Sequence, residues 1–140
     1  MMTARELLES AINDSGQQVV KIFENLPPDS WDQKPAPEGM TIRAMAQHLC
    51  ECYYAYSEMA QGRTYDWGSY AVEVTEPADL VALVLSLRSE AAKIALDGSD
   101  KAMKDSLEFL CLHDAYHVGQ IALIRIRTEP NWDPYSIYGS

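Results

Sequence analysis

The chain has 140 residues, which is enough for one domain with its own hydrophobic core. Aspartate and glutamate number 21 against 11 lysines and arginines, so the formal net charge is -10 at pH 7. A negative field of this size repels nucleic-acid backbones and anionic membrane surfaces, which argues against both as partners and leaves small molecules and proteins.

The first predicted elements are two amphipathic helices. Apolar residues recur at helical spacing from Thr3 to about Leu26, which predicts a helix there. The apolar positions are Leu7, Leu8, Ala11, Ile12, Val19, Ile22, Phe23 and Leu26. Residues 27–40 are rich in proline and are expected to form an irregular connection. Thr41 is then expected to cap a second helix that Gly62 ends.

A long connection leads to the third predicted helix. Residues 62–74 are polar and aromatic without a helical stripe, although the segment YAVEV favours a short extended piece. Thr75 is expected to cap the third helix, with Pro77 in its first turn and the DGSD turn at its end. Its expected buried stripe is Leu80, Leu83, Val84, Leu87, Ala91 and Ile94.

A fourth helix is predicted from Asp100 or Asp105 to Arg127, followed by an irregular tail over residues 128–140 that is apolar enough to pack on the body of the protein. Four such helices predict an all-α four-helix bundle, with residues 1–140 forming a single domain.

The lengths of the connections predict the order of the helices. A helix of about 20 residues is about 30 Å long, and the connection before the third helix reaches about 43 Å when extended. It can therefore run the length of the bundle and leave the second and third helices parallel. The short DGSD turn makes the third and fourth helices antiparallel, which gives an up-down-down-up topology.

The chain shows no signal for export or membrane insertion. Its first ten residues lack an apolar run between a basic start and a cleavage site, and no stretch approaches the roughly 20 apolar residues of a membrane span. A cytoplasmic location is therefore expected. The three cysteines, Cys50, Cys52 and Cys111, are odd in number, so reduced thiols are expected.

All three histidines of the chain fall on predicted helices. His113 and His117 are four residues apart, which places them one turn apart on one face of the fourth helix. His48 lies in the middle of the second helix, beside positions expected to face inward. Imidazoles placed in this way can share a metal ion. Hydrogen-bonded core histidines are the alternative, but they would not be expected to use every histidine of the chain.

The segments around these histidines resemble a known family. IRAMAQHL in the second helix and HDAYHVGQIALIR in the fourth are similar to motifs of the DinB-like (YfiT-like) superfamily of four-helix-bundle metalloproteins, and WDQKPAPEGMTIR resembles the lead-in to them. The resemblance covers about Trp31 to Arg127. It implies that His48, His113 and His117 bind one divalent metal ion, that the bundle has the up-down-down-up order, and that the protein forms a homodimer.

The set of ligands predicts the chemistry. Three neutral imidazoles leave a divalent ion with an open position, which is typical of catalytic rather than structural sites. A water or a thiol bound there loses its proton more readily and becomes a nucleophile. Relatives in the superfamily include transferases and isomerases that use a low-molecular-weight thiol such as bacillithiol or mycothiol. The first interpretation is therefore a metal-dependent thiol transferase or hydrolase acting on a small molecule. Because imidazole suits several metals, zinc or nickel is the expected cofactor, with iron or manganese as alternatives.

The sequence is also compatible with two other functions. The first is a non-catalytic metal-binding or stress-response protein, built as a helical dimer, whose site senses or stores an ion. The second is a helical dimerisation module whose histidines are incidental. Metal binding separates the module from the other two functions, because the module needs no ion.

Several residues near the predicted ligands have more than one interpretation. Cys52, one turn after His48, is a fourth ligand, a redox-sensitive neighbour or a buried packing residue. Gln120 either orients a bound water or ligand or makes a hydrogen bond between helices. Glu51 and Asp114 either accept the distal N–H of a ligand imidazole or lie on the surface.

Other residues nearby are expected to serve packing. Cys50 and Cys111 are each two residues from a predicted ligand, about 200° around the helix, so they should face away from the ion. Gly119 is expected to permit close approach of helices. The tyrosines whose hydroxyl groups are candidates for lining the pocket are Tyr53, Tyr54, Tyr56 and Tyr116.

Overall fold

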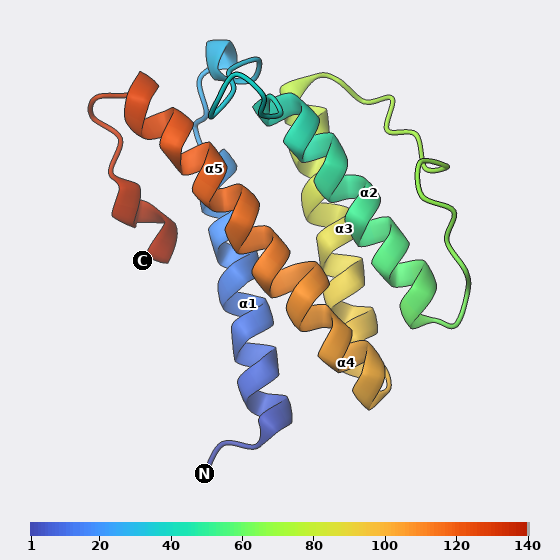
Figure 1. Ribbon diagram of the computed structural model, residues 1–140. Helices are drawn as coiled ribbons and strands as arrows, with labels where there is room; N and C mark the ends of the chain where they lie inside the picture. The colour runs from blue at the N-terminus through green and yellow to red at the C-terminus, as the bar shows by residue number, and fades with distance from the viewer. Residues whose placement is uncertain (140) are drawn as a thin grey trace.

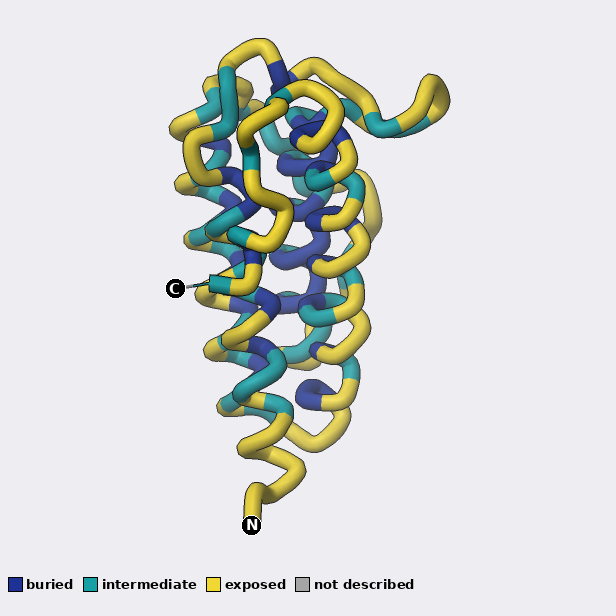
Figure 2. Tube along the Cα trace, turned by 90° about the vertical axis from the view of Figure 1, so that its left-hand side faces the viewer, coloured by how far each residue is buried: buried dark blue, intermediate teal, exposed yellow. Residues whose placement is uncertain are grey.

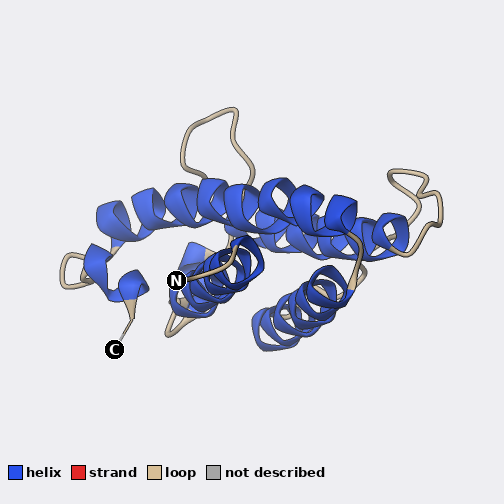
Figure 3. Ribbon diagram, turned by 90° about the horizontal axis from the view of Figure 1, so that it is seen from below, coloured by secondary structure: helices blue, strands red, loops and turns tan. Residues whose placement is uncertain are grey.

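The computed structural model describes residues 1–139, which form helices and loops without a strand (Figures 1 and 3). The main helices are α1 (Ala4–Phe23), α2 (Ile42–Ala60), α3 (Pro77–Asp97), α4 (Asp100–Ser106) and α5 (His113–Thr128). The short elements are the 3-10 helices η1 (Pro28–Ser30) and η3 (Pro134–Tyr138) and the π-helical segment η2 (Leu107–Leu112). Because η2 joins α4 to α5 in one continuous helix, the predicted all-α four-helix bundle is confirmed.

The order of the helices is also the predicted one. In Figure 1 the chain runs up through α1 and down through α2, returns to the top along the outside of the bundle, and then runs down α3 and up through α4 and α5. Buried residues line the inner faces of the helices (Figure 2). Within the described part of the chain, no helix is long and apolar enough to cross a membrane.

α1 begins with a capping box and ends earlier than expected. The Thr3 hydroxyl accepts a hydrogen bond from the Glu6 N–H at 3.1 Å, and the Glu6 carboxylate accepts one from the Thr3 N–H at 2.8 Å. The helix ends at Phe23, about three residues before the predicted end, because Asn25 takes a positive φ of 57°. Leu7 was expected on the buried stripe but is exposed. It belongs to the first turn of α1, close to the N-terminal end of the chain, which is exposed in Figure 2.

The cap of α2 is the predicted one, whereas that of α3 is not. The Thr41 hydroxyl accepts a hydrogen bond from the backbone N–H three residues later, at 3.0 Å. Thr75 does not cap α3, which begins at Pro77 after an N-cap at Glu76. The Thr75 carbonyl instead accepts a hydrogen bond from the guanidinium of Arg43, which fixes the end of the long connection on α2.

The connection between α2 and α3 is held to α2 by side chains. Glu51 accepts hydrogen bonds from the Tyr65 hydroxyl at 2.7 Å and from the Gly68 N–H at 2.9 Å. Gln47 donates to the carbonyl of Val74 at 3.2 Å. The YAVEV segment at the end of this connection is loop and not a strand.

The buried face of α3 is rotated relative to the predicted stripe. The buried residues are Leu80, Val84, Arg88, Ala91 and Ala95. The half-buried residues that the prediction placed in the core are Leu83, Leu87 and Ile94. The rotation turns Arg88 inward, where it meets a buried carboxylate described below.

The last helix and the tail agree with the prediction in outline. The Ser99 hydroxyl accepts a hydrogen bond from the N–H three residues later at 3.1 Å, so the helix begins at Asp100, the earlier of the two predicted starts. The tail packs against α1 as expected, and Ile137 is buried. It is not wholly irregular, because it contains η3. The Trp132 ring lies 4.8 Å from the guanidinium carbon of Arg125, a cation–π contact that ties the tail to α5.

Candidate metal centre

Three histidine side chains converge between α2 and α5. His48 comes from the middle of α2, while His113 and His117 occupy the first and second turns of α5. The Nε2 atom of His113 lies 3.2 Å from Nε2 of His48 and 3.1 Å from Nε2 of His117. The three rings meet one another edge to face. The structure therefore brings together the residues that the sequence predicted as a site.

The spacing of these nitrogens fits a shared ion. Two nitrogens that each lie about 2.0–2.1 Å from one tetrahedrally coordinated ion are about 3.3 Å apart. The two Nε2 separations at His113, 3.2 Å and 3.1 Å, are close to this value. Side chains from two helices would need little movement to bind one divalent cation.

The histidines are neutral at pH 7, which is the form that binds metal. Burial lowers the pKa of His113 to about 4, helped by the neighbouring His117 and His48. Burial also lowers the pKa of His117 to about 4, and it lowers the pKa of His48. Each ring therefore has one nitrogen with a free lone pair, and no proton has to be lost before an ion binds.

The orientation of His117 is fixed by Gln120. The Nδ1 atom of His117 lies 2.8 Å from Oε1 of Gln120. Because a carbonyl oxygen can only accept, Nδ1 carries the hydrogen and Nε2 keeps its lone pair for a ligand bond. Gln120 thus makes a hydrogen bond to an imidazole of its own helix. This is neither of its two predicted roles, which were to orient a bound water or ligand or to join two helices.

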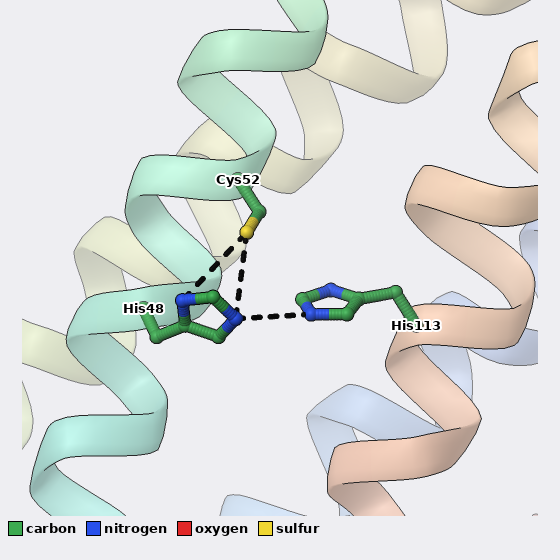
Figure 4. Close-up of side chains that lie close together, drawn as sticks. All are labelled: His48, Cys52 and His113. Atoms are coloured by element: carbon green, nitrogen blue, oxygen red, sulfur yellow. Dashed lines mark hydrogen bonds between the residues drawn. The ribbon is translucent and has the colours of Figure 1, made fainter. Parts of the chain in front are cut away.

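Cys52 is the fourth side chain of the cluster. Its Sγ lies 3.6 Å from Nε2 and 3.8 Å from Nδ1 of His48 (Figure 4). One ligand atom from each of His48, Cys52 and His113 lies within 4.8 Å of the other two, a His/Cys/His group that is compatible with a divalent metal. Burial raises the pKa of the Cys52 thiol to about 11, so the sulfur is protonated at neutral pH until a cation replaces the proton.

Neither carboxylate near the site accepts a hydrogen bond from a ligand imidazole. Glu51 binds the long connection, and the Nδ1 atom of His113 is buried without a hydrogen-bond partner in the described residues. Asp114 follows His113 directly but is fully buried and points elsewhere. Asp114 is therefore neither a partner of a ligand imidazole nor a surface residue, and both predictions for it are wrong.

Asp114 belongs to a buried polar network that was not predicted from the sequence. Its carboxylate accepts hydrogen bonds from Nε of Arg88 at 2.7 Å and from the Tyr53 hydroxyl. Arg88 also donates to the Ser15 hydroxyl at 2.7 Å and to the carbonyl of Ile12 at 2.8 Å. Four helices, α1, α2, α3 and α5, are thus joined at one point. The sequence did contain one signal for this network, because Arg88 is an arginine among the apolar positions of α3.

The network adjoins the cluster of histidines and Cys52, because two of its residues directly follow members of the cluster in the sequence. Asp114 is the residue after His113, and Tyr53 is the residue after Cys52. Burial raises the pKa of Asp114 to about 6, against the opposing effect of Arg88, so the carboxylate is ionised at pH 7. The ion pair with Arg88 and the hydrogen bond from Tyr53 therefore fix α5 and α2 at the residues next to two members of the cluster.

The remaining residues near the site have separate roles. Cys50 is fully buried in the core and Cys111 is half-buried against it, as expected of packing residues. Tyr56 donates to a backbone carbonyl of α4, and Tyr54 stacks on the long connection. Tyr116 alone among the four candidate tyrosines has its ring against a histidine of the cluster, with its centroid 5.0 Å from that of His117.

A family model described as the DinB superfamily matches residues 11–121. No curated protein and no solved structure matches the chain. The matched range includes all three histidines and Cys52.

Proposed function

Because the chain belongs to the DinB superfamily, we propose that it is a metal-dependent enzyme in which His48, His113 and His117 hold one divalent ion. The proposed reaction is the attack of a thiol or a water on a small electrophile. The observation that carries the proposal is the convergence of three neutral imidazoles from two helices, with Nε2 atoms 3.1 Å and 3.2 Å apart. Imidazole ligands suit zinc and nickel, and iron or manganese are further candidates.

The ion and the residues around it have different roles in the proposed site. A bound divalent ion supplies the positive charge that lowers the pKa of a water or thiol in its open position. Gln120 holds the ring of His117, and the Asp114 ion pair holds the backbone of α5 next to His113. His48 and His113 are half-buried, so part of each side chain is open to solvent.

The substrates proposed are a low-molecular-weight thiol and a small electrophile. The thiolate sulfur forms a bond to carbon, the halide or epoxide oxygen leaves with the bonding electrons, and the thiol proton passes to solvent or to the opened epoxide. A cytoplasmic location is part of the proposal, because such thiols are reduced there and the three cysteines are free.

Metal-loaded protein should conjugate such a thiol to a haloalkane or epoxide at neutral pH faster than chelated protein does. Loss of free thiol measures the rate, with zinc and nickel tested separately. His48→Ala should remove the acceleration and weaken metal binding by at least about tenfold, because one of three nitrogens is lost. The matched control is Gln47→Ala on the same helix, whose side chain binds a loop carbonyl, and it should keep the metal.

Two results would contradict the proposal. Equal rates with and without metal, across several thiols and acceptors, would exclude thiol activation at this site. Unchanged metal content in His48→Ala would show that the ion is not held by the three histidines.

A second candidate function is a non-catalytic metal-binding protein, and the position of Cys52 favours it. A sulfur at about 2.3 Å and a nitrogen at about 2.0–2.1 Å from one tetrahedral ion are about 3.6 Å apart. Cys52 Sγ and His48 Nε2 are 3.6 Å apart. If Cys52 is a ligand together with the three histidines, four protein atoms complete the coordination and no open position is left for a substrate.

The spectrum of cobalt-loaded protein separates the two candidates. A thiolate ligand gives cobalt(II) a strong near-ultraviolet charge-transfer band, which three imidazoles and water do not give. With an open site, wild type and Cys52→Ala should have the same spectrum. With a closed site, the band should be present in wild type and in Cys50→Ala, which changes the other thiol of α2, and absent from Cys52→Ala.

A further inference from the structure

An apolar groove lies between the first half of α1 and the segment formed by α4 and η2, at the lower end of the bundle in Figure 1. Its volume is about 690 Å³, which is within the range of about 300–1,000 Å³ that is typical of small-molecule sites. Most of the side chains that line it are apolar, namely Ala4, Leu7, Leu8, Ala11, Met103 and Leu107.

The groove has a covered floor and an open rim. Met103 is buried, and Leu8 and Ala11 are half-buried. Leu7 of α1 and Leu107 of η2 expose 62 % and 44 % of their surface on either side. An apolar molecule can therefore enter from solvent and cover these leucines without any movement of the helices.

Two cationic side chains in the wall of the groove have no carboxylate partner. Nη1 of Arg5 donates to Sδ of Met103 at 3.2 Å, and a thioether sulfur is only a weak acceptor. Within residues 1–139, neither Arg5 nor Lys104 forms an ion pair. Asp100 is the one acidic residue that lines the groove. Two positive charges and one negative charge give the wall a net charge of +1, although the whole chain has a formal net charge of -10.

We infer that the groove binds a fatty acid, a molecule with one apolar chain and one carboxylate. The chain lies along the apolar floor, and the carboxylate lies between Arg5 and Lys104. Hydrogen bonds from a guanidinium to a carboxylate are charge-assisted, so they are stronger than the bond that Arg5 makes to sulfur. None of the histidines of the metal centre lines the groove, so binding there does not require an ion.

The charges favour a free fatty acid over the other amphiphiles. A neutral or cationic head group would leave Arg5 and Lys104 without a partner. A phosphate monoester carries about -1.5 to -2 at pH 7, which a wall charge of +1 matches less well than it matches a carboxylate. An anionic membrane surface would be repelled by the net charge of the chain, whereas one small anion in the groove meets mainly the local charges.

The test is calorimetric titration of the metal-loaded full chain with dodecanoate, at concentrations below those at which it forms micelles. One dodecanoate should bind per chain, with a dissociation constant on the order of 100 μM. In a half-open groove, each pair of added methylene groups should tighten binding about fourfold from octanoate to decanoate to dodecanoate. Dodecanol, which has the same chain without the charge, should bind about tenfold more weakly.

Variants test each part of the groove. The double variant Arg5→Gln, Lys104→Gln should weaken dodecanoate binding about tenfold and leave dodecanol binding unchanged. Its matched control is Lys101→Gln, since Lys101 lies on the same helix as Lys104 but pairs with Asp105 outside the groove. Ala11→Phe should weaken binding of both probes at least about tenfold, because the ring would occupy the floor, and circular dichroism checks that this variant folds.

His48→Ala distinguishes the groove from the metal centre, because a carboxylate could also bind an ion there. This variant should bind dodecanoate as wild type does, and a loss of binding would overturn the location. An absence of saturable binding up to about 1 mM would overturn the inference, as would equal affinities for dodecanoate and dodecanol.

Two further measurements identify other occupants of the groove. Sedimentation of the chain with phosphatidylglycerol vesicles, in a protein that does not bind dodecanoate, would show a membrane-binding surface instead. A dimer in light scattering that Leu7→Glu converts to the monomer of 15.7 kDa would show that a second copy covers the groove. Either result would overturn the assignment to a fatty acid.

Discussion

Asp114→Ala should lower the free energy of unfolding by about 3–5 kcal/mol, because Arg88 would stay buried without its counter-ion. The side chains of Arg88 and Asp114 expose 8 % and 0 % of their surface, and their N–O distance is 2.7 Å. Tyr53 would lose a hydrogen-bond acceptor as well. Urea unfolding monitored by circular dichroism measures the effect as a shift of the midpoint at constant slope.

The control for Asp114→Ala is Asp105→Ala, which breaks the Lys101–Asp105 pair of α4. That pair has a distance of 2.6 Å, but the Lys101 side chain exposes 83 % of its surface. Solvent screening should limit its effect to less than about 1 kcal/mol. Replacing Arg88, Asp114 and Tyr53 together by apolar residues of similar volume should recover much of the lost stability, because no unpaired charge is left.

Equal losses in Asp114→Ala and Asp105→Ala would contradict the assignment of the buried network as the point that joins four helices. Substitutions at Asp114 also test whether the buried network positions the metal ligands. If the network positions His113, Asp114→Asn should weaken metal binding even where the protein remains folded.

The sequence was sufficient to predict the helices and their order, because both depend on local signals. Periodic apolar residues mark α1 and α2, Thr41 caps α2 by a bond to a neighbour in sequence, and the length of the 61–76 connection allows α2 and α3 to be parallel. The pairing of His113 with His117 is likewise local, since four residues make about one helical turn.

The remaining features could not be predicted from the sequence, because they depend on how the helices are rotated and packed against each other. Arg88 and Asp114 are 26 residues apart on α3 and α5, and only the tertiary packing of the helices brings them together. The π-helical turns of η2 change the register just before His113, and no sequence signal predicts such a segment. Thr75 was a good capping residue by type, but its backbone is held by Arg43, so the helix begins one residue later.

Removal of the metal should leave the fold intact but lower its melting temperature. α1 and α3 contribute no residue to the cluster, yet each has fully buried residues in the core, among them Ile12, Ile22, Leu80 and Val84. This apolar burial does not depend on an ion. Chelated protein should therefore keep its helical circular dichroism and melt cooperatively.

The expected size of the shift follows from mass action. An ion that binds only the folded chain stabilises it by about 2.7 kcal/mol at a free concentration of a hundred times its dissociation constant. For a chain of 140 residues this corresponds to a rise in melting temperature on the order of 10 °C. In the triple variant His48→Ala, His113→Ala, His117→Ala, metal should produce no shift, whatever the variant's own stability. Loss of helical signal at 25 °C on chelation would show instead that the ion holds the bundle together, and an open catalytic position would then lose its support, because structural ions are enclosed by protein ligands.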